Sequence, residues 1–336
     1  MCGRLPVFER IKSSLANYRR VADDGGAHRS GVILRLLITG ASGLLGASLI
    51  NRSRDALDVI ACAHQTVLRA SRFEVCNVDL VDAAQVDRII KQYRPDWICH
   101  SAALTNVDLC QSEPALAYQQ NVHASINIAK AGERHGSKLL LISTDSVFSG
   151  EQGNYVETDH PLPINVYAQT KLESECRVQA ILSQALIARV NFYGWNIQAK
   201  HSLAEWVLKQ LQSGSAVSGW TDVYFTPLFT NHLADLLLEM VRLDFQGIYH
   251  VGGSERVSKY DFARAVAEVW GYDPARVLKT KSKESDLSAP RPGDTSMCCD
   301  KLSHALKRSL PDLRGGLNAM RESGETDFVS FKQSVA

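Results

Sequence analysis

Several features that define large classes of protein are missing from this sequence of 336 residues. No run of about 18 apolar residues occurs, so we expect no segment that crosses a membrane. The net charge of +1 gives no basic field for nucleic acid and no polybasic stretch for an anionic membrane. The expected partner is therefore a small molecule.

Signatures of other chemistries are missing as well. There is no G-x-S-x-G elbow, which argues against a hydrolase. The glycine-rich segment at 40–46 is not followed by Lys-Ser/Thr, which excludes a P-loop. The eight cysteines show neither C-x-x-C nor histidine-rich spacing, so no metal site is predicted. We expect free, buried thiols in a reducing compartment, and hence a cytoplasmic protein.

The first 31 residues are of mixed charge and lack the apolar core of a secretory signal, and we expect a disordered extension there. From residue 32, short apolar runs alternate with amphipathic stretches. Strands are expected at 33–39, 57–63, 73–77, 96–100, 138–143 and 185–190, and helices near 44–52, 82–93, 113–134 and 166–182.

This alternation predicts parallel strands joined by right-handed helical crossovers, which is an α/β fold with a doubly wound parallel sheet. We expect a dinucleotide-binding Rossmann-type domain over residues 32–190. After it the regularity fades, and helical patterns return at 201–213, 231–242 and 258–270. Residues 191–336 are predicted to form mainly a smaller substrate-binding domain, with segments that return to the nucleotide domain.

A glycine turn follows the first expected strand, in the sequence LITGASGLLG at 37–46. Gly40 allows a tight exit from the strand, Gly43 lets backbone approach a pyrophosphate, and Gly46 lets the following helix pack close to the sheet. The helix N-terminus would then face the phosphates. The cofactor-binding residues predicted in this turn are Gly40, Ser42, Gly43, Leu44, Leu45 and Gly46.

The ends of the next strands predict which dinucleotide is bound. An acidic residue at the end of the second strand would bind the ribose 2′-hydroxyl of NAD, but the run VIACAHQT at 59–66 has none, which favours NADPH or use of both cofactors. His64, helped by Arg69, could lie near a 2′-phosphate, and a surface histidine without that role is the alternative. Further cofactor contacts are predicted at Asp79 and Leu80 for adenine, and at Ala102, Ala103 and Thr105 for ribose and nicotinamide.

A catalytic group is predicted where the fifth strand ends in Ser143-Thr144-Asp145 and the next helix carries Tyr167 and Lys171. Tyr167 and Lys171 lie one helical turn apart, so their side chains share a face. A nearby ammonium favours the phenolate and lowers the pKa of a phenol from about 10. This equipment is typical of a carbonyl reductase in which Tyr167 donates a proton, Lys171 tunes it and binds the cofactor, and Thr144 orients the carbonyl.

Taken together, these motifs resemble those of the extended short-chain dehydrogenase/reductases, and within them the dTDP-4-dehydrorhamnose reductase family. The resemblance runs from about residue 35 to 305 and rests on the glycine turn and four further segments: HSAALTNVDLCQSEP at 100–114, LLISTDSVFSG at 140–150, PINVYAQTKLESE at 163–175 and RPGDTSMCCDKL at 291–302. It implies hydride transfer from NADPH or NADH to the C4 carbonyl of a nucleotide-linked 6-deoxy-4-keto sugar. We expect substrate contacts at Thr105, Val107, Val147, Phe148 and, for the diphosphate, Arg291.

Two departures from the family pattern leave the sugar open: Ser146 stands where a tyrosine is usual, and Ser-Met-Cys-Cys-Asp replaces a more typical Ser-Leu-Asp-Thr. Other functions also remain. One is a catalytically idle NADP-binding subunit like the regulatory partner of methionine adenosyltransferase. Others are a nucleotide-sugar epimerase, a general ketone reductase and a 4,6-dehydratase, although the acidic pair of a dehydratase is missing at Asp145-Ser146. The assembly is open too, with a homodimer among the alternatives.

Overall fold

The structure is a computed structural model, which describes residues 33–335 except 54–56, 65–72, 199 and 285–286. The extension expected at 1–31 and the position of Arg69 lie outside the described residues. From Leu34 the chain forms one compact unit. A division into a nucleotide domain and a substrate domain at residue 190 stays a prediction.

A seven-stranded sheet forms the centre of this unit, and every pairing in it is parallel. The strand order is β11-β6-β5-β4-β1-β2-β3. Their bounds are β1 Arg35–Thr39, β2 Asp58–Ala63, β3 Glu74–Asn77, β4 Trp97–His100, β5 Lys138–Thr144, β6 Leu186–Val190 and β11 Gly247–Val251. The predicted doubly wound parallel α/β fold is confirmed, and β11 is an additional strand that the sequence did not indicate.

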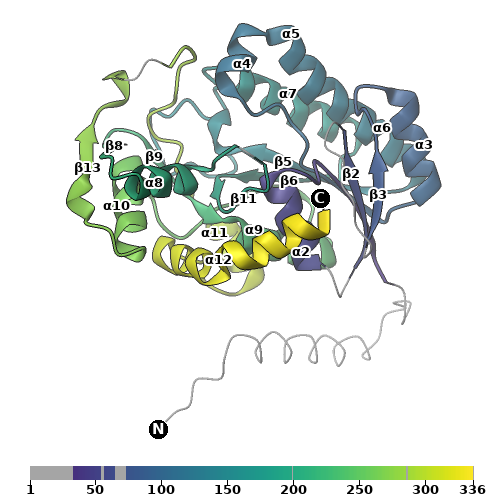
Figure 1. Cartoon of the computed structure of the whole chain (residues 1–336). Coiled ribbons are helices and arrows are strands. Elements are labelled where there is room, and N and C mark those ends of the chain that lie inside the picture. Colours follow the sequence, from purple (N-terminus) through teal and green to yellow (C-terminus); the bar gives the residue numbers. More distant parts are fainter. Residues whose placement is uncertain (1–32, 54–56, 65–72, 199, 285–286, 336) are drawn as a thin grey trace. The chain divides into compact units, whose positions relative to one another are not determined.

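Helices cover both faces of the sheet because its strands are apolar on both sides. On one face lie α3 (Ala83–Tyr93), α6 (Ala124–His135) and α7 (Val166–Ile181), and on the other α2 (Leu44–Ser53) and α9 (Thr230–Arg242), as Figure 1 shows. Leu36 and Ile38 of β1 belong to the core on the α2 side, while Leu37 between them belongs to the opposite core. The alternation of a strand therefore fixes which helix each residue meets.

The single helix expected at 113–134 is divided in the structure. It consists of α5 (Pro114–Ala117), the π-helical turn η1 (Tyr118–His123) and α6, and it follows the short α4 (Val107–Ser112). α7 begins as predicted, because Asn165 caps its first turn by accepting a 2.9 Å hydrogen bond from the Ala168 amide. The cap fixes where the helix that carries Tyr167 starts.

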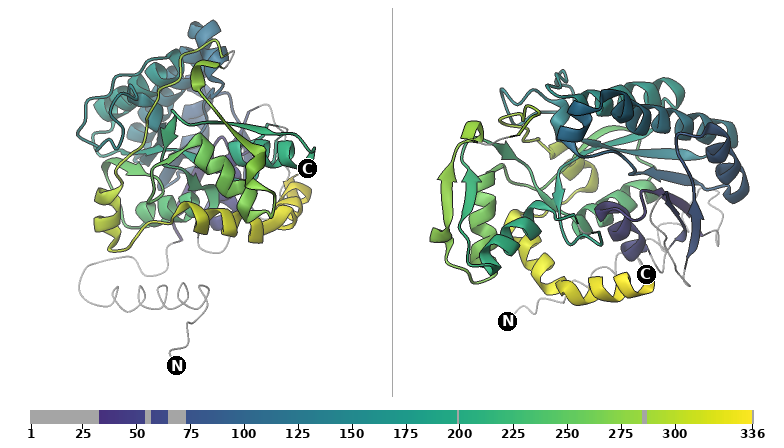
Figure 2. Two further views of the ribbon diagram at one scale, coloured as in Figure 1. Left: turned by 90° about the vertical axis from the view of Figure 1, so that its left-hand side faces the viewer. Right: turned by 45° about the horizontal axis from the view of Figure 1, so that its top comes forward.

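The elements after β6 build a further hydrophobic cluster, in which Leu208, Phe225 and Phe262 are buried. In Figure 1 and in the right view of Figure 2, α10 and β13 of this part lie away from β2 and β3. The helices here are α8 Leu203–Gln212, α10 Lys259–Val269, α11 Asp300–Leu306 and α12 Leu313–Val335, with short turns η2 Asp145–Val147, η3 Pro274–Arg276 and η4 Ser282–Glu284. The strands are β7 Phe192–Tyr193, β8 Val217–Trp220, β9 Tyr224–Phe225, β10 Leu228–Phe229, β12 Val257–Ser258 and β13 Val277–Thr280.

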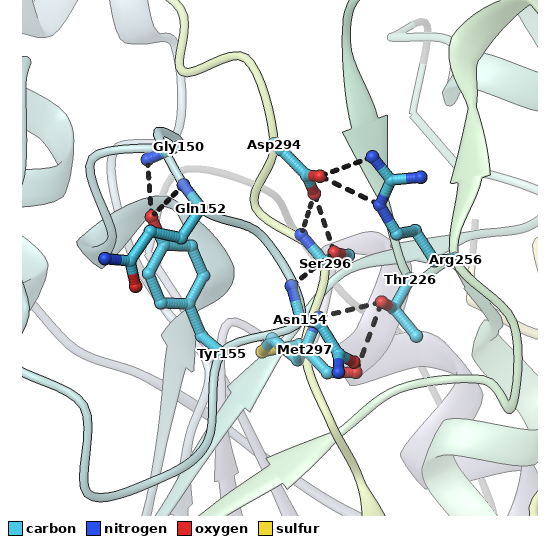
Figure 3. Close-up of polar contacts among 9 residues, drawn as sticks. All are labelled: Gly150, Gln152, Asn154, Tyr155, Thr226, Arg256, Asp294, Ser296 and Met297. Atoms are coloured by element: carbon cyan, nitrogen blue, oxygen red, sulfur yellow. Dashed lines mark hydrogen bonds and ion pairs between the residues drawn. The ribbon is translucent and has the colours of Figure 1, made fainter.

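One segment of this C-terminal part, residues 294–297, runs back beside the loop that follows β5. Asp294 accepts hydrogen bonds from Ser296 and forms an ion pair with Arg256, and the Met297 amide donates to Thr226 Oγ1 at 2.9 Å (Figure 3). Tyr155, in the loop after β5, forms an isolated bridge with Met297. The segment therefore ties the late part of the chain to the edge of the sheet where β5 ends.

The expectation of free cysteines is wrong for one pair, because Cys62 and Cys76 form a disulfide. The two residues are direct partners in the register of β2 and β3, with their Cα atoms 4.9 Å apart. The sequence could not show this, because register depends on how the strands pair and not on the spacing of 14 residues between the cysteines. Cys99, Cys110, Cys176, Cys298 and Cys299 are free.

Candidate active site

A cavity of about 770 Å³ opens where the strand order reverses, between the carboxyl ends of β1 and β4. Ligands in open α/β sheets bind at such a switch point. Most of the predicted cofactor and catalytic residues line it: Gly40, Ser42, Gly43, Leu44, Leu45, Gly46, His64, Leu80, Ala102, Ala103, Thr105, Thr144, Tyr167 and Lys171. The fold therefore brings residues from six separate segments to one cavity.

The glycine turn is tight enough that side chains could not replace two of its glycines. Gly40 has a φ of +67°, and a Cβ there would lie 2.8 Å from the Ala102 amide nitrogen. A Cβ at Gly46 would lie 2.2 Å from the Gly40 carbonyl oxygen. Because both positions exclude a side chain, backbone amides at the start of α2 border the cavity, which is the cradle that a dinucleotide pyrophosphate needs.

Thr144 and Tyr167 form the centre of the candidate catalytic group. Burial raises the pKa of Tyr167 above its ordinary value, a hydrogen bond with Thr144 lowers it, and the charge of Asp145 raises it. The Thr144 hydroxyl donates at 3.1 Å to Asp145 Oδ1. The pKa of Tyr167 is therefore raised, not lowered as its spacing from Lys171 predicted, and Tyr167 is held as a neutral phenol, which is the form that can donate a proton.

Lys171 lies one turn after Tyr167 on α7 and is only 3% exposed. Burial lowers its pKa to about 8, and the carboxylate of Glu175 raises it. His100, at the end of β4, faces this lysine. Burial and the charge of Lys171 lower the pKa of His100 to about 3, so the imidazole is neutral and links Thr39 and Ser125 by hydrogen bonds of 2.8 and 3.1 Å.

The structure adds polar groups that sequence reasoning did not assign. Asp145 lines the cavity and is 2% exposed, and its Oδ2 accepts hydrogen bonds from Asn191 at 2.7 Å and from Thr295 at 2.6 Å. Asn191 directly follows β6, and its place at a strand end was the available signal. For Thr295 no such signal was available, because Thr295 contacts Asp145 only when segment 294–297 returns to the sheet.

The connection between β7 and α8 also borders the cavity, through Asn196, Gln198, Lys200, His201 and Ser202. Gln198 donates a 2.9 Å hydrogen bond to the Ser42 carbonyl in the glycine turn, and Lys200 donates one of 3.1 Å to Thr105 Oγ1. These contacts join the connection between β7 and α8 to the first and fourth strand ends.

Several predicted site residues lie elsewhere and are not among those lining the cavity. Asp79 Oδ1 accepts a hydrogen bond from the Val81 amide, and Val107 is the first residue of α4. Val147 and Phe148 are fully buried, with the Phe148 ring stacked on Tyr155. Arg291 forms a 2.8 Å ion pair with Asp108. For these residues a ligand contact stays a prediction that a change of conformation would have to support.

Among the residues described, no helix is long and apolar enough to cross a membrane. Within the same residues, no group of three or more histidine, cysteine, aspartate or glutamate side chains is placed to hold a metal ion.

Comparison with known proteins finds a family model and solved structures that are similar to this chain. The family model for the RmlD substrate binding domain matches residues 34–325. A dTDP-4-dehydrorhamnose reductase from Bacillus anthracis, solved in complex with NADP, has a TM-score of 0.77 at 25% identity and covers 87% of this chain and 100% of its own. A hypothetical dTDP-4-dehydrorhamnose reductase from Sulfolobus tokodaii has a TM-score of 0.75 at 33% identity, covering 84% and 99%.

Among curated proteins, two kinds of relative occur. A probable low-salt glycan biosynthesis reductase of Haloferax volcanii is 29% identical over 87% of this chain and 99% of its own length. The methionine adenosyltransferase 2 subunit beta of Xenopus tropicalis is 32% identical over 80% of this chain and 81% of its own. The family resemblance predicted from the sequence motifs is confirmed, and the relatives include both reductases and beta subunits of methionine adenosyltransferase 2.

Proposed function

The chain belongs to the RmlD substrate-binding-domain family, and from this premise we propose that it reduces the C4 keto group of a nucleotide-linked 6-deoxy-4-keto sugar. The observation that carries the proposal is the cavity that Thr144, Tyr167 and Lys171 line together, with Lys171 one turn after Tyr167 on α7. The presence of Thr144, Tyr167 and Lys171 together argues against a catalytically idle subunit.

The cofactor of the proposal is NADPH, with NADH as the alternative. The residues fit such a group, because the glycine turn excludes side chains where a pyrophosphate would lie and His64 lies exposed at the end of β2 with no acid beside it. When bound, the nicotinamide supplies the hydride for the carbonyl carbon. A solved relative from Bacillus anthracis binds NADP, which supports this choice.

In this proposal, side chains of the protein donate the proton that the carbonyl oxygen of the substrate receives. Thr144 and Tyr167 hydrogen-bond the carbonyl oxygen of the substrate, and Tyr167 donates its proton as charge develops on that oxygen. Lys171, as an ammonium, stabilises the phenolate that remains. Its pKa of about 8 means that this cation is lost as the pH rises through that value, so the rate is expected to fall there.

A panel experiment tests the proposal. The protein is mixed with NADPH or NADH and a series of nucleotide-linked 4-keto sugars, and loss of absorbance at the reduced nicotinamide band is followed beside Tyr167→Phe. We expect turnover by the wild type and a fall of about 10²–10⁴-fold in kcat for the variant, with cofactor binding retained. Equal rates for both proteins would refute the role of Tyr167.

A second function has its own support. Relatives about a third identical to this chain carry the name of a methionine adenosyltransferase subunit, so a cofactor-binding regulatory subunit is the alternative. This alternative would be favoured if the wild type and Tyr167→Phe were both inert toward every sugar, while the wild type bound NADPH and captured a defined partner enzyme. Turnover of simple ketones or epimerisation without net cofactor loss would instead favour the other short-chain activities.

A further inference from the structure

A buried carboxylate lies directly behind the candidate catalytic group and has no part in the proton transfer described above. Glu175 is one helical turn beyond Lys171 on α7, and it is 1% exposed. Residues one turn apart on a helix share a face, so its carboxylate lies on the side of Lys171 that is away from Tyr167. A charge this deeply buried is retained only where its surroundings compensate it.

The surroundings of Glu175 hold it rigidly in place. Arg189 of β6, itself 2% exposed, donates to both carboxylate oxygens, from Nε at 3.1 Å and from Nη2 at 2.7 Å. The Ser143 hydroxyl of β5 donates to Oε1. Ser143 lines the cavity and precedes Thr144, so the same strand end positions the substrate-orienting hydroxyl and anchors this carboxylate.

Among the described residues, Glu175 is the negative charge that acts on Lys171. Burial pulls the pKa of the lysine down to about 8, and Glu175 opposes that shift. From β4, His100 faces the lysine as a neutral imidazole. The other titratable groups around the site are Tyr167 on α7, Asp145 after β5, Cys110 on α4 and Arg189 on β6.

We propose that Glu175, anchored by Arg189 and Ser143, is a positioning residue that keeps Lys171 cationic at the cavity. The inference rests on the proposed reductase function for its biological meaning, but the charge state of Lys171 can be measured without turnover. A contribution to stability alone explains the ion pair poorly, because the desolvation of both charges costs roughly as much free energy as their attraction contributes. An effect on the charge state of Lys171 is a second role for the pair.

The test measures the titration midpoint of Lys171. The protein is treated with acetic anhydride over a series of pH values, and acylation of Lys171 is measured by mass spectrometry of the peptide that contains it. Glu175→Gln removes the charge and keeps the shape. We expect the midpoint of Lys171 to fall by about one pH unit or more, because burial and Arg189 then act without opposition. Arg189→Met should move the midpoint in the opposite direction, upward, because Glu175 loses its counter-charge.

Glu173→Gln is the matched control. Glu173 lies on the same helix and forms an ion pair with Arg177 at 2.7 Å, its side chain is 32% exposed, and it is not among the residues that line the cavity. We expect it to leave the midpoint unchanged. An unchanged midpoint in folded Glu175→Gln, or shifts of the same sign in Glu175→Gln and Arg189→Met, would overturn the proposal.

Folding of each variant is checked by circular dichroism, because removing one partner of a buried ion pair is strongly destabilising. If Glu175→Gln does not fold, Glu175→Asp decides: its shorter side chain withdraws the charge, so a smaller fall in the midpoint supports the proposal and no fall overturns it. A protein that binds NADPH and shows these shifts but reduces no sugar would refute the proposed reaction and leave the role of Glu175 intact.

Discussion

Thr295 Oγ1 donates a 2.6 Å hydrogen bond to Asp145 Oδ2 across 150 residues of sequence. Asp145 in turn accepts a hydrogen bond from Thr144, which lines the same cavity as Tyr167. The segment that returns from the C-terminal part therefore helps to hold the strand end that carries the candidate catalytic threonine.

Removing that contact should destabilise the protein. Thr295→Val keeps the shape but leaves one oxygen of a buried carboxylate with a single partner, and hydrogen bonds to charged groups contribute about 1.5–3 kcal/mol. We expect the free energy of unfolding, measured with urea, to fall by that amount. Thr295→Ser keeps the hydroxyl and should lose much less. Equal losses in both variants would indicate a packing effect of the methyl group.

Gly46→Ala should impair dinucleotide binding, because its Cβ would lie 2.2 Å from the Gly40 carbonyl oxygen and must displace the turn. We expect NADPH affinity, measured by cofactor fluorescence, to weaken at least about tenfold, which corresponds to 1.4 kcal/mol. Gly136→Ala is the control: its φ of +77° makes the substitution strained by about 1 kcal/mol, but it has open space and lies outside the cavity. Retained affinity in Gly46→Ala would contradict the cradle.

His64→Asp should shift the cofactor preference from NADPH toward NADH. A carboxylate at the end of β2 accepts a hydrogen bond from a ribose 2′-hydroxyl and repels a 2′-phosphate. We expect the ratio of the two kcat/KM values to move at least about tenfold toward NADH. His64→Asn introduces a side chain of similar size without the charge, and a shift of the same size there would exclude the electrostatic explanation.

Buried His100 should make the protein sensitive to acid. Its pKa is lowered to about 3 in the folded protein, so between its ordinary value of about 6.5 and that value only the unfolded state binds the proton. Stability is therefore full above pH 6.5 and is lost as the pH falls, by about 1.4 kcal/mol per pH unit for this one group. Unfolding measured from pH 7 to 4 should show a slope that His100→Gln reduces by one proton. His123→Gln, at an exposed position, should leave the slope unchanged.

The sequence predicted the parts of this protein that depend on local patterns. Apolar runs located β1 to β6, the glycine spacing located the turn before α2, and the interval between Tyr167 and Lys171 placed both on one face of α7. These features follow from the periods of strands and helices and from the conformations that only glycine adopts, so neighbouring residues are enough to read them.

Tertiary structure decided everything that depends on which segments meet. The pairing of β2 with β3 brought Cys62 to Cys76, the returning segment brought Thr295 to Asp145, and the packing of β6 against α7 brought Arg189 to Glu175. It also placed Phe148 in the core and Arg291 beside Asp108. Register and long-range return of the chain are set by the summed burial of many side chains, and no local stretch of sequence contains that sum.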